Sequence, residues 1–383
     1  MRSERTGRPS ICFVALNAYD ALSGRKNIAQ MGGAEVQQTR IGRWLVRRGY
    51  SVSFVTLDYG QPDGADIDGM KVYKAYKENT GIRSLRFIHP RWTGLWSAMA
   101  RANAEVYYQR CAGDETGQVA LWCYLHRRTF IFAAASDPDC EPSSCALKSW
   151  REKTLYRLGL KLANAVTVQT INQQQRMRQK MGIDTVVVRN CGWNIATHSS
   201  CVQPLSVGTS KIHVLWLGRI SGEKRLELLL EAAAKCPEIS FDVVGAPNTM
   251  CAYASRVMKC AAAIPNVKMH GQVPHDEIGA YYQRCQVLCC TSAYEGFPNT
   301  FLEAWSLGIP VVSTCDPDNV IRDNGLGAVV TDADDIVSSL RKLLQSRDAW
   351  SAASRAARRY YQEHHSPEVC LPVFEQVFLE VAG

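Results

Sequence analysis

A chain of 383 residues, 46% hydrophobic and 21% charged, has the composition of a globular protein, and its length favours two domains. It contains no apolar run near the ~20 residues that span a bilayer. Residues 1–195 hold 28 Lys and Arg against 16 Asp and Glu, whereas residues 196–383 hold 16 against 20, so we expect an anionic partner for the first half. Patterns of helix-turn-helix, zinc-finger or RNP-like modules are absent, which argues against nucleic acid as that partner.

The 15 cysteines include no CxxC pair, and Cys12, Cys289 and Cys290 lie in apolar runs typical of strands. We therefore expect buried free thiols rather than disulfides or a metal site. Cys140 and Cys145 come closest to a ligand pair, but nothing nearby completes a zinc set. The basic N-terminal residues precede a predicted strand rather than the apolar segment of a signal peptide, so we expect a cytoplasmic protein.

The chain opens with a β–α–β pattern. A predicted strand at 10–16 leads through a long loop to Gly32 and Gly33. Apolar positions at helical spacing then predict a helix at 34–48, and a strand follows at 51–57. The glycine pair either lets the backbone approach a ligand closely or makes an ordinary tight turn, and it is not the GxGxxG fingerprint of dinucleotide-binding folds.

The alternation of strands and helices continues and restarts after a polar stretch. Further strands are predicted at 104–110, 129–135, 165–168 and 185–188, then at 212–217, 240–245, 267–271, 287–292, 310–314 and 327–330. Helices are predicted at 119–126, 146–162 and 170–180, then at 226–235, 253–262, 275–284, 332–346, 348–363 and 367–381. The pattern indicates an α/β fold with a first domain at 1–195, a linker at 196–210, a second domain at 211–360 and a last segment at 361–383. Two doubly wound domains of this kind bind ligands in the cleft between them, at the carboxyl ends of strands.

Two carboxylates flank a predicted helix start in the stretch from Tyr294 to Glu303. Glu295 lies in the loop after the strand at 287–292, and Glu303 lies on the first turns of the next helix. The free N–H groups and the dipole of a helix N-terminus favour an anion, whereas a carboxylate suits sugar hydroxyls. The combination favours a sugar nucleotide. The alternative is an ordinary strand–loop–helix connection with Glu303 in solvent.

A basic loop joins the strand at 212–217 to the next helix. Arg219 and Lys224 leave the carboxyl end of that strand, on the rim where Glu295 is expected. Two cations at this rim neutralise a diphosphate, Arg as a bidentate fork and Lys as a point charge. A solvated basic turn is the alternative for this loop taken by itself.

These motifs resemble those of GT-B glycosyltransferases of the retaining family 4, in order and separation from about residue 10 to 380. The resemblance rests on Gly32-Gly33-Ala34-Glu35, on Gly218-Arg219 with Lys224, and on Glu295 with Glu303 around Gly296-Phe297-Pro298. It implies two Rossmann-like β/α/β domains that face each other across a cleft. The first would bind the acceptor and the second a nucleotide-diphosphate sugar, and the final helix at 361–383 would cross back to the first domain.

The resemblance also implies roles for individual residues. Arg219 and Lys224 match the cations on the diphosphate, Glu295 the carboxylate on the donor sugar, and Glu303 the carboxylate on the ribose. Residues implied to approach the phosphate or sugar through their backbone are Gly32, Gly33, Phe297, Asn299 and Thr300. No metal or cofactor is implied beyond the donor substrate.

One departure concerns the catalytic base. Many relatives have a His at the end of the strand where this chain has Ala135-Ser136-Asp137, so Asp137 is a candidate base or positioning group, or a cap of the following turn. In a retaining mechanism on one face of the sugar, the leaving diphosphate itself deprotonates the acceptor, and no side-chain base is required. We therefore expect transfer of a hexose to a glycan or lipid-linked acceptor, in polysaccharide biosynthesis. An epimerase of the same fold and a non-catalytic nucleotide-sugar-binding module are the alternatives.

The segment from Arg83 to Arg101 is basic and aromatic. Arg83, Arg86, Arg91 and Arg101 alternate there with Phe87, Ile88, Trp92, Leu95 and Trp96. Such a mixture suits the headgroup layer of an anionic membrane, which would place the protein peripherally on the inner face of the membrane. The helical spacing of Trp92, Leu95 and Trp96 fits a core-facing helix equally well.

Overall fold

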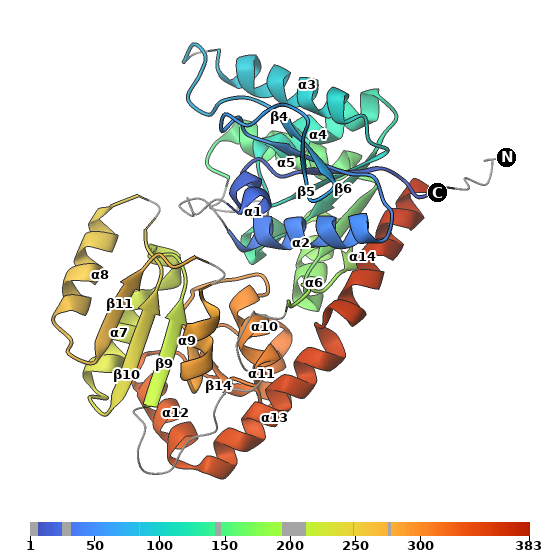
Figure 1. Ribbon diagram of the computed structural model, residues 1–383. Helices are drawn as coiled ribbons and strands as arrows, with labels where there is room; N and C mark the ends of the chain where they lie inside the picture. The colour runs from blue at the N-terminus through green and yellow to red at the C-terminus, as the bar shows by residue number, and fades with distance from the viewer. Residues whose placement is uncertain are drawn as a thin grey trace. The chain divides into compact units, whose positions relative to one another are not determined.

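The computed structural model describes residues 7–24, 32–83, 85–141, 147–193, 212–247, 249–274 and 277–383, and the predicted linker at 196–210 lies outside them. The chain forms two compact units (Figure 1). The first unit is Met1–Arg189 with Cys370–Gly383, and the second is Asn190–Val369. The chain therefore returns to the first unit at residue 370, whereas the sequence placed this return at 361.

The first unit is built on an eight-stranded sheet in the order β3-β4-β2-β1-β5-β6-β7-β8. Its strands are β1 (Ile11–Val14), β2 (Val52–Thr56), β3 (Ala65–Ile67), β4 (Met70–Lys74), β5 (Val106–Arg110), β6 (Thr129–Ala133), β7 (Ala165–Val168) and β8 (Val186–Val187). Its helices are α1 (Tyr19–Ser23), α2 (Gly33–Arg47), α3 (Thr93–Ala102), α4 (Asp114–Leu125), α5 (Trp150–Leu162), α6 (Ile171–Met181) and the end of α14 (Pro367–Ala382). The strand pairs are parallel apart from β3 with β4, an antiparallel edge that the sequence did not predict.

The C-terminal helix α14 completes the core of the first unit. The Phe378 ring lies 6.1 Å from that of Phe13 and 5.7 Å from that of Tyr108, in strands β1 and β5. All three residues are buried, and burying an aromatic side chain removes a large apolar area from water. This packing explains why a segment so distant in sequence belongs to the first unit.

The second unit is a six-stranded parallel sheet in the order β11-β10-β9-β12-β13-β14. Its strands are β9 (Ile212–Leu217), β10 (Ile239–Val244), β11 (Val267–Gly271), β12 (Val287–Cys290), β13 (Val311–Ser313) and β14 (Gly327–Val329). Its helices are α7 (Leu226–Ala234), α8 (Ala252–Ala262), α9 (Gly279–Arg284), α10 (Asn299–Ser306), α11 (Val320–Asn324), α12 (Ala333–Gln345) and α13 (Arg347–His364). The chain runs outward from β9 through β10 and β11, then returns to the other side of β9 with β12. The topological switch point, where α/β sheets usually bind ligands, thus lies between β9 and β12.

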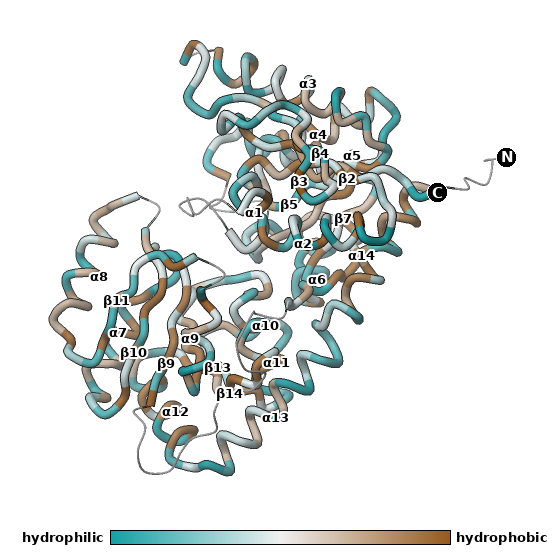
Figure 2. The backbone as a smooth tube through the Cα atoms, viewed as in Figure 1, coloured by the Kyte–Doolittle hydropathy of each residue, from teal (hydrophilic) through white to brown (hydrophobic). Residues whose placement is uncertain are grey.

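Hydropathy follows this architecture. In Figure 2, helix α8 alternates hydrophobic and hydrophilic residues along its turns, and its Ala254, Val257 and Ala261 are buried.

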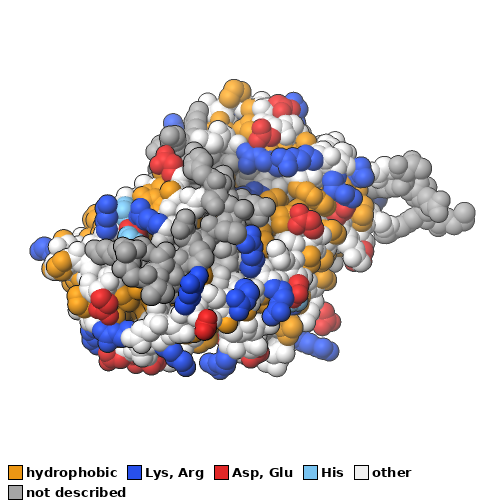
Figure 3. All heavy atoms as spheres, turned by 60° about the horizontal axis from the view of Figure 1, so that its bottom comes forward, with side chains coloured by type: hydrophobic (Ala, Val, Ile, Leu, Met, Phe, Trp, Pro, Cys, Tyr) orange, Lys and Arg blue, Asp and Glu red, His pale blue; other side chains and the backbone are white. Residues whose placement is uncertain are grey.

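On the face shown in Figure 3, Lys and Arg side chains form several groups among hydrophobic and uncharged ones. Within the described ranges, no helix combines the length and the apolar character needed to cross a membrane.

Candidate functional site

The basic loop after β9 is held against the end of β10. The N–H of Gly218 donates to the Val244 oxygen at 3.1 Å, and that of Ile220 donates to the Ala246 oxygen at 3.2 Å. Gly245, between these acceptors, has φ +143°, and a Cβ there would lie 1.8 Å from the Gly218 oxygen. Only glycine permits this approach, so Gly245 fixes where the basic loop begins.

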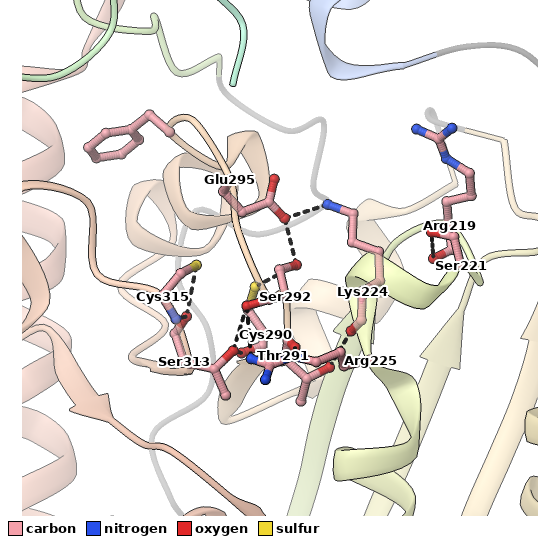
Figure 4. A network of polar contacts seen from close by, with 12 residues as sticks. Arg219, Ser221, Lys224, Arg225, Cys290, Thr291, Ser292, Glu295, Ser313 and Cys315 are labelled. Atoms are coloured by element: carbon pink, nitrogen blue, oxygen red, sulfur yellow. Dashed lines mark hydrogen bonds and ion pairs between the residues drawn. The ribbon is translucent and has the colours of Figure 1, made fainter. Parts of the chain in front are cut away.

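Lys224 and Glu295 meet at the switch point. Lys224 ends the short 3-10 turn Gly222–Lys224 after β9, and Glu295 follows β12. The Lys224 Nζ donates to Glu295 Oε1, and these side chains are only 24% and 18% exposed (Figure 4). Burial alone would lower the pKa of Lys224, but the charge and hydrogen bond of Glu295 outweigh burial and hold that pKa above its ordinary value. The loops thus present a charged, partly desolvated pair beside the start of α10.

Polar groups from β9 and from the two residues that follow β12 hold this pair in place. The Ser292 hydroxyl donates to Glu295 Oε1 at 2.6 Å, and Ser292 is 2% exposed. The Thr291 hydroxyl donates to the Lys224 main-chain oxygen at 2.7 Å and accepts the indole N–H of Trp216 at 3.0 Å. No sequence motif predicted a role for Thr291 and Ser292, although both residues stand just before Glu295.

Arg219 lies on the same loop but is exposed. In the view of Figure 4, Lys224 lies between it and Glu295. The Ser221 hydroxyl donates to the main-chain oxygen of Arg219 at 3.5 Å, and in Figure 4 no dashed line joins the Arg219 guanidinium to Lys224 or Glu295. The structure therefore brings Lys224 and Glu295 together and leaves Arg219 beside them.

Glu303 is not a solvated surface residue. It is 7% exposed in helix α10, and the hydroxyl of the buried Tyr282 donates to its Oε2 at 2.9 Å. Burial is the largest cause that raises the pKa of Tyr282, and the adjacent Glu303 carboxylate is the next. The Tyr282 hydroxyl therefore keeps its proton and donates a hydrogen bond to Glu303. The ordinary surface interpretation of Glu303 is thus wrong for this chain.

Helix α10 begins at the motif predicted to face the phosphate. Pro298 is its N-cap residue, and among the described residues no side chain caps its first turn. The carbonyl oxygen of Phe297 accepts a hydrogen bond from the buried Asn190 amide at 2.9 Å, and the Asn299 side chain lies 3.4 Å from the same amide. Thr300, in the first turn, accepts from Tyr282 through its main-chain oxygen at 3.4 Å. The first turn of α10 is therefore fixed from both sides.

Two thiols lie next to this site. Cys290 ends β12 and pairs in register with Ser313 of β13, two residues before Cys315. The pKa of Cys290 is lowered to about 7, and the largest cause is the hydrogen bond from the Cys315 thiol. The Cys290 sulfur also lies 3.5 Å from the Ser292 hydroxyl. As expected from the sequence, both cysteines are free thiols.

The predicted glycines lie in the first unit. Gly32 is the N-cap of α2, and its N–H donates to the Glu35 carboxylate at 3.1 Å; Gly33 is the first residue of the helix. A Cβ on Gly32 would lie 2.6 Å from Glu35 Oε2. Close approach of the Glu35 carboxylate therefore accounts for Gly32 without reference to a ligand.

Asp137 begins the 3-10 turn Asp137–Cys140 after β6. It accepts from the Gln173 amide at 3.1 Å and lies 3.4 Å from the Arg176 guanidinium. Asp139 is more deeply buried and accepts N–H groups from Ala135 and Ser136 at 2.7 and 3.2 Å. Asp139 thus closes the turn, while Asp137 is 28% exposed and held by α6.

Comparison with known proteins finds a family match within the second unit. Residues 211–346 match the family described as Glycosyl transferases group 1. These residues are similar to group 1 glycosyltransferases over about a third of the chain. Sulfoquinovosyl transferase SQD2 of Arabidopsis thaliana is 30% identical over 158 residues, which cover 39% of this chain and 30% of that protein.

Similarity at the level of the fold extends over the whole chain. Sucrose-phosphate synthase from Thermosynechococcus elongatus aligns with a TM-score of 0.78 at 16% identity, over 98% of this chain and 99% of that one. Anabaena HepE in complex with UDP-glucose aligns with a TM-score of 0.72 at 16% identity, over 97% and 99%. The chain therefore has a GT-B fold, as the sequence motifs predicted.

Proposed function

We propose that the protein is a retaining glycosyltransferase that moves a hexose from a nucleotide-diphosphate sugar to a glycan or lipid-linked acceptor in polysaccharide biosynthesis. The observation that carries the proposal is the desolvated Lys224–Glu295 pair at the switch point, next to the start of α10. An anion at that helix start is favoured by the N–H groups and dipole, and the cation beside it adds to the attraction. UDP-glucose, bound to the structural neighbour HepE, is the first donor to test.

The residues divide the work by charge. Lys224 and Arg219 would neutralise the diphosphate as its bond to the sugar breaks, and Glu295 would accept hydrogen bonds from sugar hydroxyls. Glu303, oriented by Tyr282, would bind the ribose hydroxyls. The acceptor oxygen bonds to the anomeric carbon on the face that the diphosphate leaves, and its proton passes to a leaving phosphate oxygen.

In this scheme the basic side chains and the start of α10 take the role that a metal ion has in other transferases, so we propose transfer without a metal. Asp137, in the first unit, would help to position the acceptor.

Donor hydrolysis tests the proposal directly. Labelled UDP-, GDP- and ADP-sugars are incubated with the protein, and the products are resolved by chromatography and proton NMR. The proposal predicts slow release of the free sugar with the donor's anomeric configuration. An epimerised sugar nucleotide would instead identify an epimerase, and tight binding without hydrolysis or transfer would identify a binding module.

The exposed apolar side chains nearest to the predicted membrane segment lie at its N-terminal end and just before it. Leu95 is buried, and the indole N–H of Trp96 donates to the Gln118 oxygen at 3.0 Å, so this part of α3 packs into the first unit. The turn before it exposes three large apolar side chains. Ile82, Leu85 and Ile88 are 69%, 54% and 59% exposed.

We propose that this turn, with the exposed Arg83 beside it, contacts an anionic membrane from the cytoplasmic side. Co-sedimentation with vesicles of anionic or neutral lipid tests it. Binding should require anionic lipid, weaken with salt, and fall in a Leu85→Glu variant. Lys259→Glu, which removes an exposed cation from α8 in the second unit, is the matched control. Equal recovery in the supernatant with both vesicle types would contradict the proposal.

A further inference from the structure

Arg225 occupies a backbone conformation that ordinarily favours glycine. It lies between the 3-10 turn that ends at Lys224 and the first residue of α7, with φ +45° and ψ +49°. For a residue with a Cβ this left-handed conformation is unfavourable. The surroundings must therefore hold Arg225 in place, and its side chain shows how.

The guanidinium of Arg225 bridges the two loops of the candidate site (Figure 4). Its Nε donates to the main-chain oxygen of Thr291 at 3.0 Å, and its Nη2 donates to that of Ser292 at 3.2 Å. A planar guanidinium forks to two adjacent carbonyls in a way that the single ammonium of Lys cannot. The bridge therefore fixes the direction in which the chain leaves β12.

The two segments that Arg225 joins carry Lys224 and Glu295. Ser292, whose oxygen accepts from Arg225, donates its hydroxyl to Glu295 at 2.6 Å. On the other side, Lys224 is the covalent neighbour of Arg225, and its main-chain oxygen accepts the Thr291 hydroxyl at 2.7 Å. Arg225 thus joins the two segments from which Lys224 and Glu295 extend.

We propose that Arg225 is a positioning residue that holds the Glu295 carboxylate in register with Lys224 and with the donor sugar. The proposal rests on the function proposed above, because it assigns Glu295 to the sugar. A carboxylate that touches the reacting sugar must be placed to within a fraction of an ångström, whereas nucleotide binding at α10 tolerates more movement of that loop.

Arg225→Gly is the informative variant, because glycine suits the left-handed backbone while it removes the guanidinium. The expected result is a melting temperature near that of the wild type, an unchanged affinity for UDP, and a fall in donor turnover of about tenfold or more. Arg225→Lys keeps the charge but not the fork, and should recover part of the lost turnover. Arg256→Ala, which removes an exposed Arg from α8 in the same unit, should leave turnover unchanged.

A double-mutant cycle separates positioning from general stability. If Arg225 acts through Glu295, Arg225→Gly should lower turnover much less in a Glu295→Gln background than in the wild type. The same loss in both backgrounds, or wild-type turnover in Arg225→Gly, would overturn the proposal.

Hydrogen–deuterium exchange of the peptide that covers 291–298 gives a readout independent of turnover. Exchange there should rise in Arg225→Gly, and unchanged exchange would also overturn the proposal. A wild-type protein that turns over no donor would refute the proposed function instead, and the exchange measurement would still decide whether Arg225 holds the loop.

Discussion

Removal of the Lys224 ammonium should weaken nucleotide binding by a predictable factor. The side chain is 24% exposed and bonds to Glu295, so in Lys224→Ala the carboxylate loses its cation and keeps the Ser292 hydroxyl. A diphosphate bound at the start of α10 would lose a charge-assisted hydrogen bond and would face an uncompensated carboxylate. Such a bond contributes about 1.5–3 kcal/mol, which corresponds to roughly 10- to 150-fold in the dissociation constant.

Isothermal titration calorimetry with UDP, and with GDP and ADP if UDP does not bind, measures this factor. Lys235→Ala is the matched control, because Lys235 also pairs with a carboxylate, that of Asp334, in the same unit, but on the surface. Surface pairs contribute little, so the control should bind as the wild type does. Equal affinity of Lys224→Ala and the wild type for every nucleoside diphosphate would refute the assignment of Lys224 to the diphosphate.

Three other expectations follow from the same contacts. Glu295→Gln should lower donor turnover far more than nucleotide affinity, whereas Glu303→Gln should chiefly lower nucleotide affinity. Steady-state kinetics measures the turnover of the two variants, and calorimetry measures their nucleotide affinity. Identical behaviour of the two variants would contradict the roles proposed for Glu295 and Glu303. Alkylation of Cys290 by iodoacetamide, measured by mass spectrometry, should become faster as the pH rises through about 7, because the thiolate forms above the pKa of Cys290. Cys289 should stay unreactive, because burial raises the pKa of its thiol. Turnover should survive EDTA, since basic side chains serve the diphosphate; loss on chelation that manganese or magnesium restores would contradict this.

The sequence predicted those parts of the site that follow from a general property of parallel sheets. The loops with Lys224 and Glu295 could be placed on one rim, because carboxyl ends of parallel strands share an edge of the sheet. Since β9 and β12 are neighbours, the two residues meet. The antiparallel strand β3, in contrast, has only three residues, too few for a recognisable alternation.

Contacts that depend on strand register and on backbone conformation could not be predicted from the sequence. Cys290 and Cys315 are 25 positions apart and come together because β12 and β13 pair with Cys290 opposite Ser313. Nothing in the order of residues gives that register. The left-handed backbone of Arg225 was equally hidden, because this conformation is predicted from glycine, asparagine or aspartate rather than from arginine. In the segment from Arg83 to Arg101, helical spacing could not tell the buried Leu95 from the exposed Ile88.

The Lys224–Glu295 pair bears on how a donor would bind. Burial by itself would lower the pKa of Lys224, and the neighbouring Glu295 carboxylate holds that pKa above its ordinary value. An arriving diphosphate must therefore compete with Glu295 for the ammonium, and the carboxylate released by that exchange is free to accept hydrogen bonds from the sugar. A nucleoside diphosphate without a sugar frees the carboxylate but gives it no new partner. The intact sugar nucleotide should therefore bind to wild-type protein more tightly than the nucleoside diphosphate does, and Glu295→Gln should reduce that difference.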